Sequence, residues 1–233
     1  MSAIYKRELK NYFTSPLGYV VLTVFAAFQG FFFYYLFYNN YGDITSLFAY
    51  MTSIAMFICP ILTMRLMSED KRLKVDQALL TAPVSLFSIV FGKFLAAFTV
   101  YASAFILTLV NQLIFAIFVT PDWVVYIGNL LGILLVGASL IAIGLFISSL
   151  TESQLVSAVV SFAVVLFILM MDTVASAVKF EFLRKIVTAC SFVTRQTGMS
   201  GGVISFADIF FFVSITALFL FLSVRVLEKK RWA

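Results

Sequence analysis

The sequence predicts an all-α integral membrane protein with six transmembrane helices. Hydrophobic residues make up 63% of its 233 residues and charged residues only 12%, and the mean hydropathy is +1.08, a composition that excludes an ordinary soluble domain. The apolar residues are gathered in long runs, which suffice to cross about 30 Å of hydrocarbon. Between two of these runs lies a long polar segment, residues 65–93, around which the chain is organised.

A short amphipathic helix at residues 1–15 is predicted to precede the first span. Its apolar residues fall on one side, and its charged residues fall on the other: Lys6, Arg7, Glu8 and Lys10. This pattern is typical of a helix that lies in the membrane interface, and Pro16 ends it. The six spans that follow, all in one domain of residues 1–233, are predicted at residues 17–38, 46–64, 94–119, 124–147, 155–171 and 206–224.

The polar segment, residues 65–93, is predicted to form a helix, a break and a second helix. Residues 67–81 alternate apolar and charged side chains without Gly or Pro, which indicates a helix. Pro83 ends this helix because the residue before a proline is pushed out of the α region, and Ser85 can cap the next one. The pattern leaves two interpretations open, a solvated loop that fixes topology and a docking element for a cytoplasmic partner.

Three other features of the spans give expectations about packing. The third run is longer than a span needs, so we expect it to be tilted. Its Asn111 and Gln112 favour hydrogen bonds between helices over contact with a substrate. In the fourth span Gly128 and Gly132 have GxxxG spacing, which predicts close packing against a neighbour. Residues 172–205 are interpreted as an interfacial amphipathic helix followed by a glycine-rich turn.

The basic residues predict the orientation of the chain. Of sixteen Lys and Arg residues, twelve lie near the termini or in the polar segment, and four lie within residues 172–205. By the positive-inside rule, both termini and the polar segment are cytoplasmic. The net charge of +5 therefore reflects membrane topology, and we expect no binding of nucleic acid.

The sequence offers no pattern typical of an enzyme. It contains no histidine, no phosphate-binding loop, no nucleophile elbow and no pair of carboxylates within one span. Cys59 and Cys190 do not have the spacing of a metal site, and their different depths argue against a disulfide. Because the spans contain almost no ionisable groups, coupling to protons or sodium is disfavoured. We expect the driving energy to come from another subunit.

Several short motifs occur in a fixed order along the chain. They are YKRELK at residues 5–10, SPLGY at 15–19, SEDKR at 68–72, LLTAPVS at 79–85, GK at 92–93, SSLTESQ at 148–154 and GGVI at 201–204. In this order and on this topology, the chain resembles the permease subunits of ABC-2 type ATP-binding cassette exporters, most closely the short gliding-motility-associated branch. One position departs from that pattern, because Lys74-Val75 stands where the family usually has Gly-Thr. We still expect a helix there, since Lys and Val fit a helix better than Gly does.

The resemblance implies a permease of the bacterial inner membrane that pairs with a second permease copy, identical or related, and with a separate ABC ATPase. ATP and Mg²⁺ would bind to that ATPase, and this chain would bind no cofactor or metal. Residues 65–93 would contain the coupling helix, and residues 1–15 would be the entry helix. The implied function is ATP-driven export, or mechanical work on an envelope assembly. The resemblance also allows an extracytoplasmic accessory protein as a partner, and membrane lipids would surround the spans. The alternative is a scaffold that recruits a cytoplasmic partner through residues 65–93 without transport.

The resemblance also nominates site residues. The candidates for contact with the ATPase, or for an ion pair with Lys6 or Arg7 of the entry helix, are Glu69, Asp70, Lys71, Arg72 and Asp76, with Pro83 ending the element. Spans two and five would face the translocation path, which nominates Thr52, Ser53, Phe57, Ser157 and Ser161. Small polar residues in membrane helices also serve packing, so the four Ser and Thr residues have that second interpretation.

Overall fold

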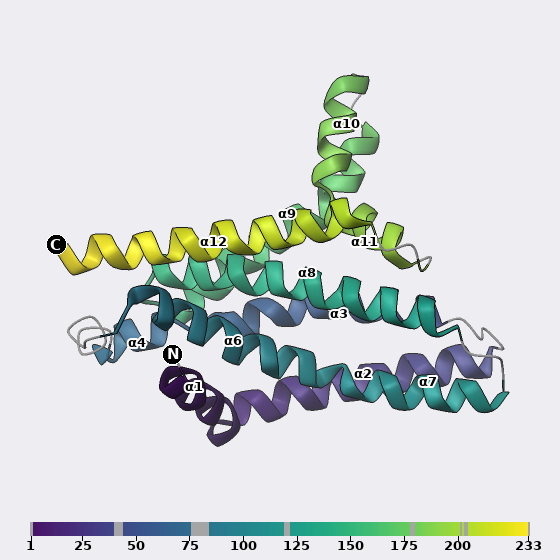
Figure 1. Cartoon of the computed structure of the whole chain (residues 1–233), viewed down its shortest axis with the longest axis horizontal. Helices are drawn as coiled ribbons and strands as arrows, with labels where there is room; N and C mark the ends of the chain where they lie inside the picture. The colour runs from purple at the N-terminus through teal and green to yellow at the C-terminus, as the bar shows by residue number, and fades with distance from the viewer. Residues whose placement is uncertain are drawn as a thin grey trace.

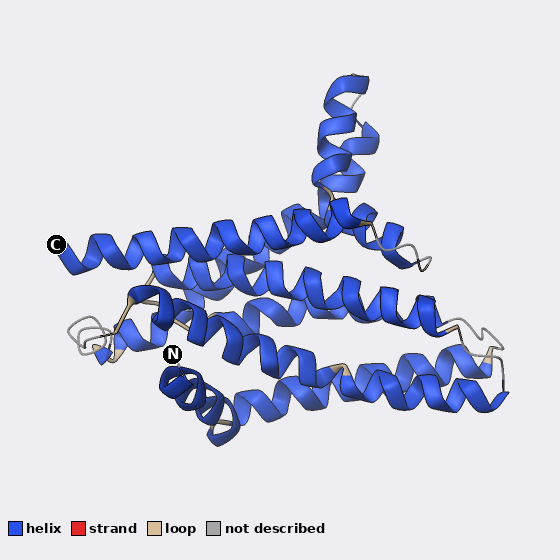
Figure 2. Ribbon diagram, viewed as in Figure 1, coloured by secondary structure: helices blue, strands red, loops and turns tan. Residues whose placement is uncertain are grey.

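The predicted fold class is confirmed. A computed structural model describes residues 2–39, 44–75, 84–118, 122–177, 180–200, 202 and 205–232. The regular structure in these ranges is entirely helical, without a strand (Figure 2). Within them, six helical stretches are long and apolar enough to cross a membrane.

The helices form an elongated bundle whose spans run side by side (Figure 1). In chain order they are α1 (Ser2–Thr14), α2 (Pro16–Tyr38), α3 (Ile44–Thr63), α4 (Ser68–Arg72), α6 (Leu86–Ala104), α7 (Ile106–Phe118), α8 (Trp123–Leu150), α9 (Gln154–Ala177), α10 (Glu181–Cys190), α11 (Phe192–Ser200) and α12 (Phe206–Trp232). Figure 1 shows the start of α1, the whole of α4 and the end of α12 at the same end of the bundle. That placement agrees with a topology in which both termini lie on one side.

Helix α8 forms the centre of the bundle. It packs against α3, α6, α9, α11 and α12, and most of its side chains are buried. The close packing predicted from Gly128 and Gly132 is confirmed, but the neighbour is the short helix α11 and not another span. A Cβ atom on Gly128 would lie 2.9 Å from the Met199 carbonyl oxygen, and one on Gly132 would lie 3.6 Å from the Gln196 side chain.

The helix of the third span begins at Leu86, as predicted for the second helix of the polar segment. The Ser85 hydroxyl accepts a hydrogen bond from the Ser88 amide at 3.3 Å and caps the helix as expected. The third span is divided at Phe105 into α6 and α7. In α7, Asn111 Nδ2 and Gln112 Oε1 are buried without a hydrogen-bond partner in the described part of the chain, so the predicted interhelical bonds are not made by these atoms.

The helix predicted over residues 67–81 is interrupted after Arg72, and residues 76–81 lie outside the described part of the chain. Helix α4 ends at Arg72, and Lys74 has a left-handed backbone with φ of 56°. The Leu73 amide donates to the Glu69 carbonyl at 2.9 Å, and the Lys74 amide donates to the Lys71 carbonyl at 3.1 Å, which closes the helix in the manner of a C-terminal cap. Lys74 therefore occupies a position that favours glycine, which is the residue that the family named above as resembling this chain usually has there. Two predicted site residues, Asp76 and Pro83, lie outside the described residues.

Replacing Lys74 by glycine is expected to stabilise the protein by up to about 1 kcal/mol. The substitution removes the cost of a left-handed backbone at a residue with a Cβ, and the greater freedom of glycine in the unfolded chain cancels part of that gain. The measurement is thermal unfolding of the purified protein in detergent. The matched control is Arg72→Gly, which places glycine inside the same short helix and is expected to lower stability by about 1 kcal/mol. Equal losses from the two substitutions would contradict the left-handed conformation.

The segment between the last two spans forms two helices where one was predicted. Helix α10 stands across the direction of the spans, and α11 follows it (Figure 1). Two polar contacts hold α11 in place: Arg195 forms an ion pair with Asp208 of α12 at 2.6 Å, and the Thr194 hydroxyl donates to Asp172 of α9 at 2.8 Å. The expected glycine turn is confirmed at Gly202, whose φ is +80°. Cys59 and Cys190 are free thiols, as expected.

Candidate functional site

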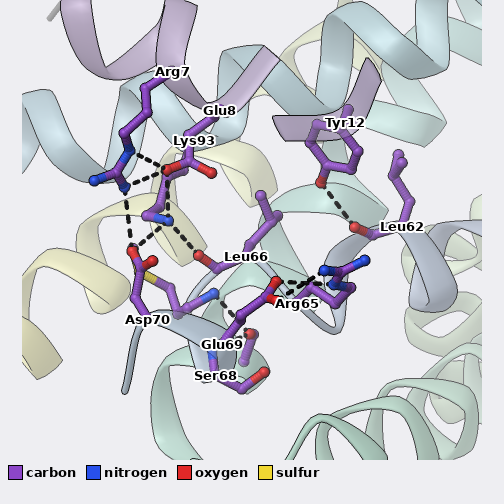
Figure 3. A network of polar contacts seen from close by, with 12 residues as sticks. Arg7, Glu8, Tyr12, Leu62, Arg65, Leu66, Ser68, Glu69, Asp70 and Lys93 are labelled. Carbon is purple, nitrogen blue, oxygen red and sulfur yellow. Dashed lines mark hydrogen bonds and ion pairs between the residues drawn. The ribbon is translucent and has the colours of Figure 1, made fainter. Parts of the chain in front are cut away.

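A buried lysine of α6 lies at the centre of an ion-pair network between the entry helix and the polar segment. Lys93 is only 1% exposed, and its Nζ atom lies 2.7 Å from Asp70 Oδ2 and 3.1 Å from Glu8 Oε1 (Figure 3). The same ammonium donates to the Leu66 carbonyl at 2.6 Å. All three donors of the ammonium therefore have acceptors, which is the condition for keeping a buried charge.

Arg7 completes the network. Its guanidinium contacts Glu8 Oε1 at 2.5 and 3.1 Å and Asp70 Oδ2 at 3.5 Å. Two cations and two carboxylates thus alternate, and each carboxylate contacts both cations. The network joins α1, α4 and α6, three elements that are far apart in the sequence (Figure 3).

The entry helix supplies Glu8 from its buried face. Ile4, Glu8 and Tyr12 follow one another at intervals of four residues, so they share one side of α1, and all three are buried. The predicted division of α1 into a charged side and an apolar side is therefore wrong for Glu8. The spacing to Ile4 and Tyr12 was the signal that could have found it. Tyr12 anchors the same face, because its hydroxyl donates to the Leu62 carbonyl at 2.9 Å.

Gly92 explains how α1 comes close enough to reach Lys93. A Cβ atom on Gly92 would lie 3.2 Å from the Ile4 side chain and 3.5 Å from the Tyr5 amide nitrogen. Contacts of 3.2 Å are closer than ordinary packing permits, so a larger residue would push the entry helix away. The Gly92-Lys93 pair therefore combines close approach with the central charge of the network.

A second set of contacts fixes α4 to the end of α8. The Ser148 hydroxyl accepts from the amides of Met67 and Ser68, both at 3.0 Å, and donates to the Met64 carbonyl at 3.2 Å. The Lys71 ammonium donates to the Ser149 carbonyl. These contacts hold the short helix against the most buried span of the bundle.

The charged residues of α4 divide into internal and surface groups. Glu69 receives two hydrogen bonds from Arg65, at 2.8 and 2.9 Å, and Asp70 belongs to the network around Lys93. Arg72 is exposed and has no ion-pair partner among the described residues, and the neighbouring Leu73 is 59% exposed. Of the predicted contact residues on α4, only Arg72 is thus fully presented on the surface.

The five residues nominated for the translocation path are not brought together. Thr52 and Ser53 line a cavity of about 190 Å³ between α3, α8, α9 and α11. Phe57 is 47% exposed and does not line it, and Ser157 and Ser161 are buried on α9, where neither hydroxyl has a partner in the described ranges. Sequence reasoning missed four polar residues of the cavity: Thr45, Asn129, Gln196 and Thr197. The Gln196 amide donates to the Thr52 hydroxyl.

Comparison with family models gives one match, to the ABC-2 type transporter model over residues 1–180. The chain belongs to the ABC-2 type transporter family. The matched residues include α1, α4, α6 and α8, and therefore every side chain of the network around Lys93. A comparison with curated proteins gives no significant match.

Membership in the ABC-2 family identifies the chain as a multi-pass permease subunit of an ABC transporter. Membrane subunits of this family are in general transport components without catalytic chemistry, and they work with an ABC ATPase. The resemblance to ABC-2 permeases is therefore confirmed at the level of the family. In this ABC-2 permease the network around Lys93 lies at the end of the bundle that also contains α4 and the end of α12 (Figures 1 and 3).

The network makes the stability of the ABC-2 permease depend on acid pH through Glu8. Burial alone would raise the pKa of this carboxyl, but Lys93 and Arg7 outweigh burial, so its pKa is lowered from the ordinary value of 4.5. A carboxyl whose pKa is lowered on folding stabilises the protein above its unfolded pKa, and that contribution disappears as the pH falls through the folded pKa. The stabilisation is therefore complete at pH 7 and is lost below about pH 4.5.

We expect Glu8→Gln to lower the free energy of unfolding by about 1–3 kcal/mol at pH 7. The difference from the wild type should shrink as the pH falls from 5 to 3, because the carboxyl of the unfolded wild type becomes protonated in this range and the charge of the folded one then contributes less stability. Thermal unfolding across this range measures it. Glu152→Gln, at an exposed position, is the control and should show no such trend. A wild-type advantage that persists undiminished at pH 3 would contradict the role of the Glu8 charge.

Proposed function

We propose that this permease works as one of a pair, homodimeric or with a related copy, and that a separate ABC ATPase docks on α4 and drives it. The cargo is a hydrophobic molecule for export, or the work is mechanical and acts on an envelope assembly, as the resemblance to the gliding-motility-associated branch implies. ATP and Mg²⁺ bind to the ATPase. Both termini face the cytoplasm of a bacterial inner membrane, an orientation supported by the distribution of basic residues.

The observation that supports this proposal is the network around Lys93. A docking element transmits movement only if it is firmly attached to the spans that must move. Asp70 attaches α4 to α6 and to α1 through Lys93 and Arg7, and Ser148 attaches it to α8. Displacement of α4 would therefore move α1, α6 and α8 together, as in a rigid-body transition between two packings.

The surface for the ATPase is formed in this proposal by Arg72, Leu73 and the residues that follow them. Arg72 supplies an exposed cation and Leu73 an exposed apolar side chain, the combination found in interfaces with a central apolar contact and a polar rim. Glu69 and Asp70 act from within, by fixing the orientation of α4. Asp76 and Pro83 stay predicted parts of the same element, and Lys6 of α1 lies exposed as a further candidate contact.

The test is co-purification from native membranes in mild detergent. Wild-type protein is expected to bring down a stoichiometric ATPase, and the double substitution Arg72→Glu with Leu73→Asp is expected to reduce the recovered ATPase at least tenfold. Lys10→Glu, an exposed charge reversal on α1, is the matched control and should leave recovery unchanged. Recovery of the chain with a partner that does not hydrolyse ATP would support the alternative, a scaffold that recruits a protein without transport.

A further inference from the structure

A cavity of about 460 Å³ opens beside the network, between α1, α4 and the ends of α2 and α3. Its charged lining residues are Arg7, Glu8, Arg65, Glu69, Asp70 and Lys93. This volume lies within the range of small-molecule sites and is large enough for a phospholipid head group. The cavity adjoins the surface proposed for the ATPase, and Leu73 and Val75 belong to both.

The cavity lies at the depth of lipid head groups. Ser15 and Leu17 line it where α2 begins at Pro16, and Arg65 and Leu66 line it just after α3 ends at Thr63. Two spans therefore begin or end within two residues of the cavity. Apolar spans end where the hydrocarbon gives way to the interface, so the cavity lies level with the head groups of the adjoining leaflet.

The lining is electrically neutral but contains both signs. Three cations face three carboxylates, so a ligand with a net charge would unbalance the site, whereas a zwitterion would not. Both the cations and the carboxylates have atoms left to bind a ligand. Nη1 of Arg7 and of Arg65 donates no hydrogen bond to the described residues, and Oδ1 of Asp70 accepts none from them. Guanidinium groups suit phosphate oxygens, and a carboxylate suits a primary ammonium.

We propose that this cavity binds the head group of a zwitterionic phospholipid with a primary amine, of the phosphatidylethanolamine type. The phosphate lies against Arg7 and Arg65, and the ammonium lies against Asp70. A choline head group satisfies the same charges but has no N–H to donate to the carboxylate, so it binds more weakly. An anionic head group adds a charge that the neutral lining does not balance.

The bound lipid has a structural consequence for the entry helix. Arg7 belongs to α1, Arg65 follows α3 and Asp70 belongs to α4, so a single head group would bridge all three. This inference does not depend on the proposed function, because the lipid site would exist in a scaffold as well as in a transporter.

The experiment compares lipids with the purified full-length chain in neutral detergent. Dioleoyl phosphatidylethanolamine, phosphatidylcholine and phosphatidylglycerol are added separately, and thermal unfolding and native mass spectrometry report binding. Phosphatidylethanolamine is expected to raise the melting temperature more than the other two lipids and to stay bound at least tenfold more often in the mass spectra. Stronger or equal retention of phosphatidylglycerol would overturn the proposal.

Paired substitutions locate the effect. Arg65→Gln with Glu69→Gln keeps the lining neutral and removes an ion pair that is partly exposed, so the protein still folds, and it is expected to abolish the preference for phosphatidylethanolamine. The control, Arg225→Gln with Glu228→Gln, removes a similar exposed pair near the end of α12 and should keep the preference. Retention of the preference in the first variant would overturn the site. Soluble phosphoethanolamine at the same concentration should stabilise little, and an effect equal to that of the lipid would overturn the assignment to a membrane lipid.

Discussion

Replacing Lys93 by methionine is expected to destabilise the protein by about 3–5 kcal/mol. Methionine fills a similar volume, but it leaves Glu8 and Asp70 close together and removes the buried cation that both of them contact. Removing one partner of a buried ion pair is costly in this range because the remaining charge is uncompensated. Thermal unfolding in detergent measures the loss, and the exposed substitution Lys10→Met is the matched control, for which no change is expected.

A rescue separates the charge of Lys93 from its packing. If uncompensated charge is the cause, the triple variant Lys93→Met, Glu8→Gln and Asp70→Asn should recover a large part of the lost stability, because it neutralises the three least exposed charges of the network together and leaves only Arg7, whose side chain is 37% exposed. A triple variant that is no more stable than Lys93→Met would show that the lysine acts through shape alone. In reconstituted membranes with the ATPase, the proposed function further predicts that the triple variant folds but hydrolyses ATP without coupling.

Gly137→Ala is expected to cost about 3 kcal/mol. A Cβ atom at this position would lie 2.1 Å from the Tyr101 ring, which is fully buried at the contact of α6 with α8. The ring cannot withdraw cheaply, since its hydroxyl donates to the Ile133 carbonyl at 2.8 Å and that bond would be lost as well. Overpacking and the lost hydrogen bond together give the expected magnitude.

Two other glycines serve as graded controls for Gly137. A Cβ atom on Gly30 of α2 would meet nothing within 4 Å, so Gly30→Ala should be neutral or stabilise by about 0.5–1 kcal/mol. On Gly132 the added atom would make ordinary contacts at 3.6 and 3.8 Å, so Gly132→Ala should fall between the other two substitutions. Differential scanning measurements of the three variants should reproduce this order. Similar losses at Gly30 and Gly137 would mean that glycine content, and not the approach of α6 to α8, is the cause.

The spans could be predicted from the sequence because hydrophobicity over about twenty residues is a local property. The start of the third span's helix, after Ser85, could also be predicted from the cap, but the burial of Lys93 could not. Two carboxylates allow this lysine to be buried: Glu8, which lies 85 residues before it in the sequence, and Asp70, which lies 23 residues before it. The residues next to Lys93 in the sequence give no sign of either contact. Tertiary pairing thus permits a lysine that has almost no exposed surface.

The candidate site was predictable in its location but not in the roles of its residues. The charges of α4 indicated a functional element, yet only the folded chain separates Arg72 on the surface from Asp70 inside. The end of α4 at Arg72 could not be predicted from the sequence either. The residue types around Lys74 favour a helix, and the observed left-handed turn depends on the surrounding structure. The residues nominated on α3 and α9 for the translocation path do not lie around one cavity. The resemblance to the family indicates which helices face a path, but it does not indicate which side of each helix does so.

The alternation of charge around Lys93 limits how this protein can change over evolutionary time. Any single charge-altering replacement among Glu8, Asp70 and Lys93 passes through an intermediate with an unbalanced charge in a buried place. Neutral drift is therefore slow at these positions, and successful changes should come in compensated sets, such as one cation and one carboxylate lost together. Descendants of this chain should keep all four charges or lose cations and carboxylates in equal number.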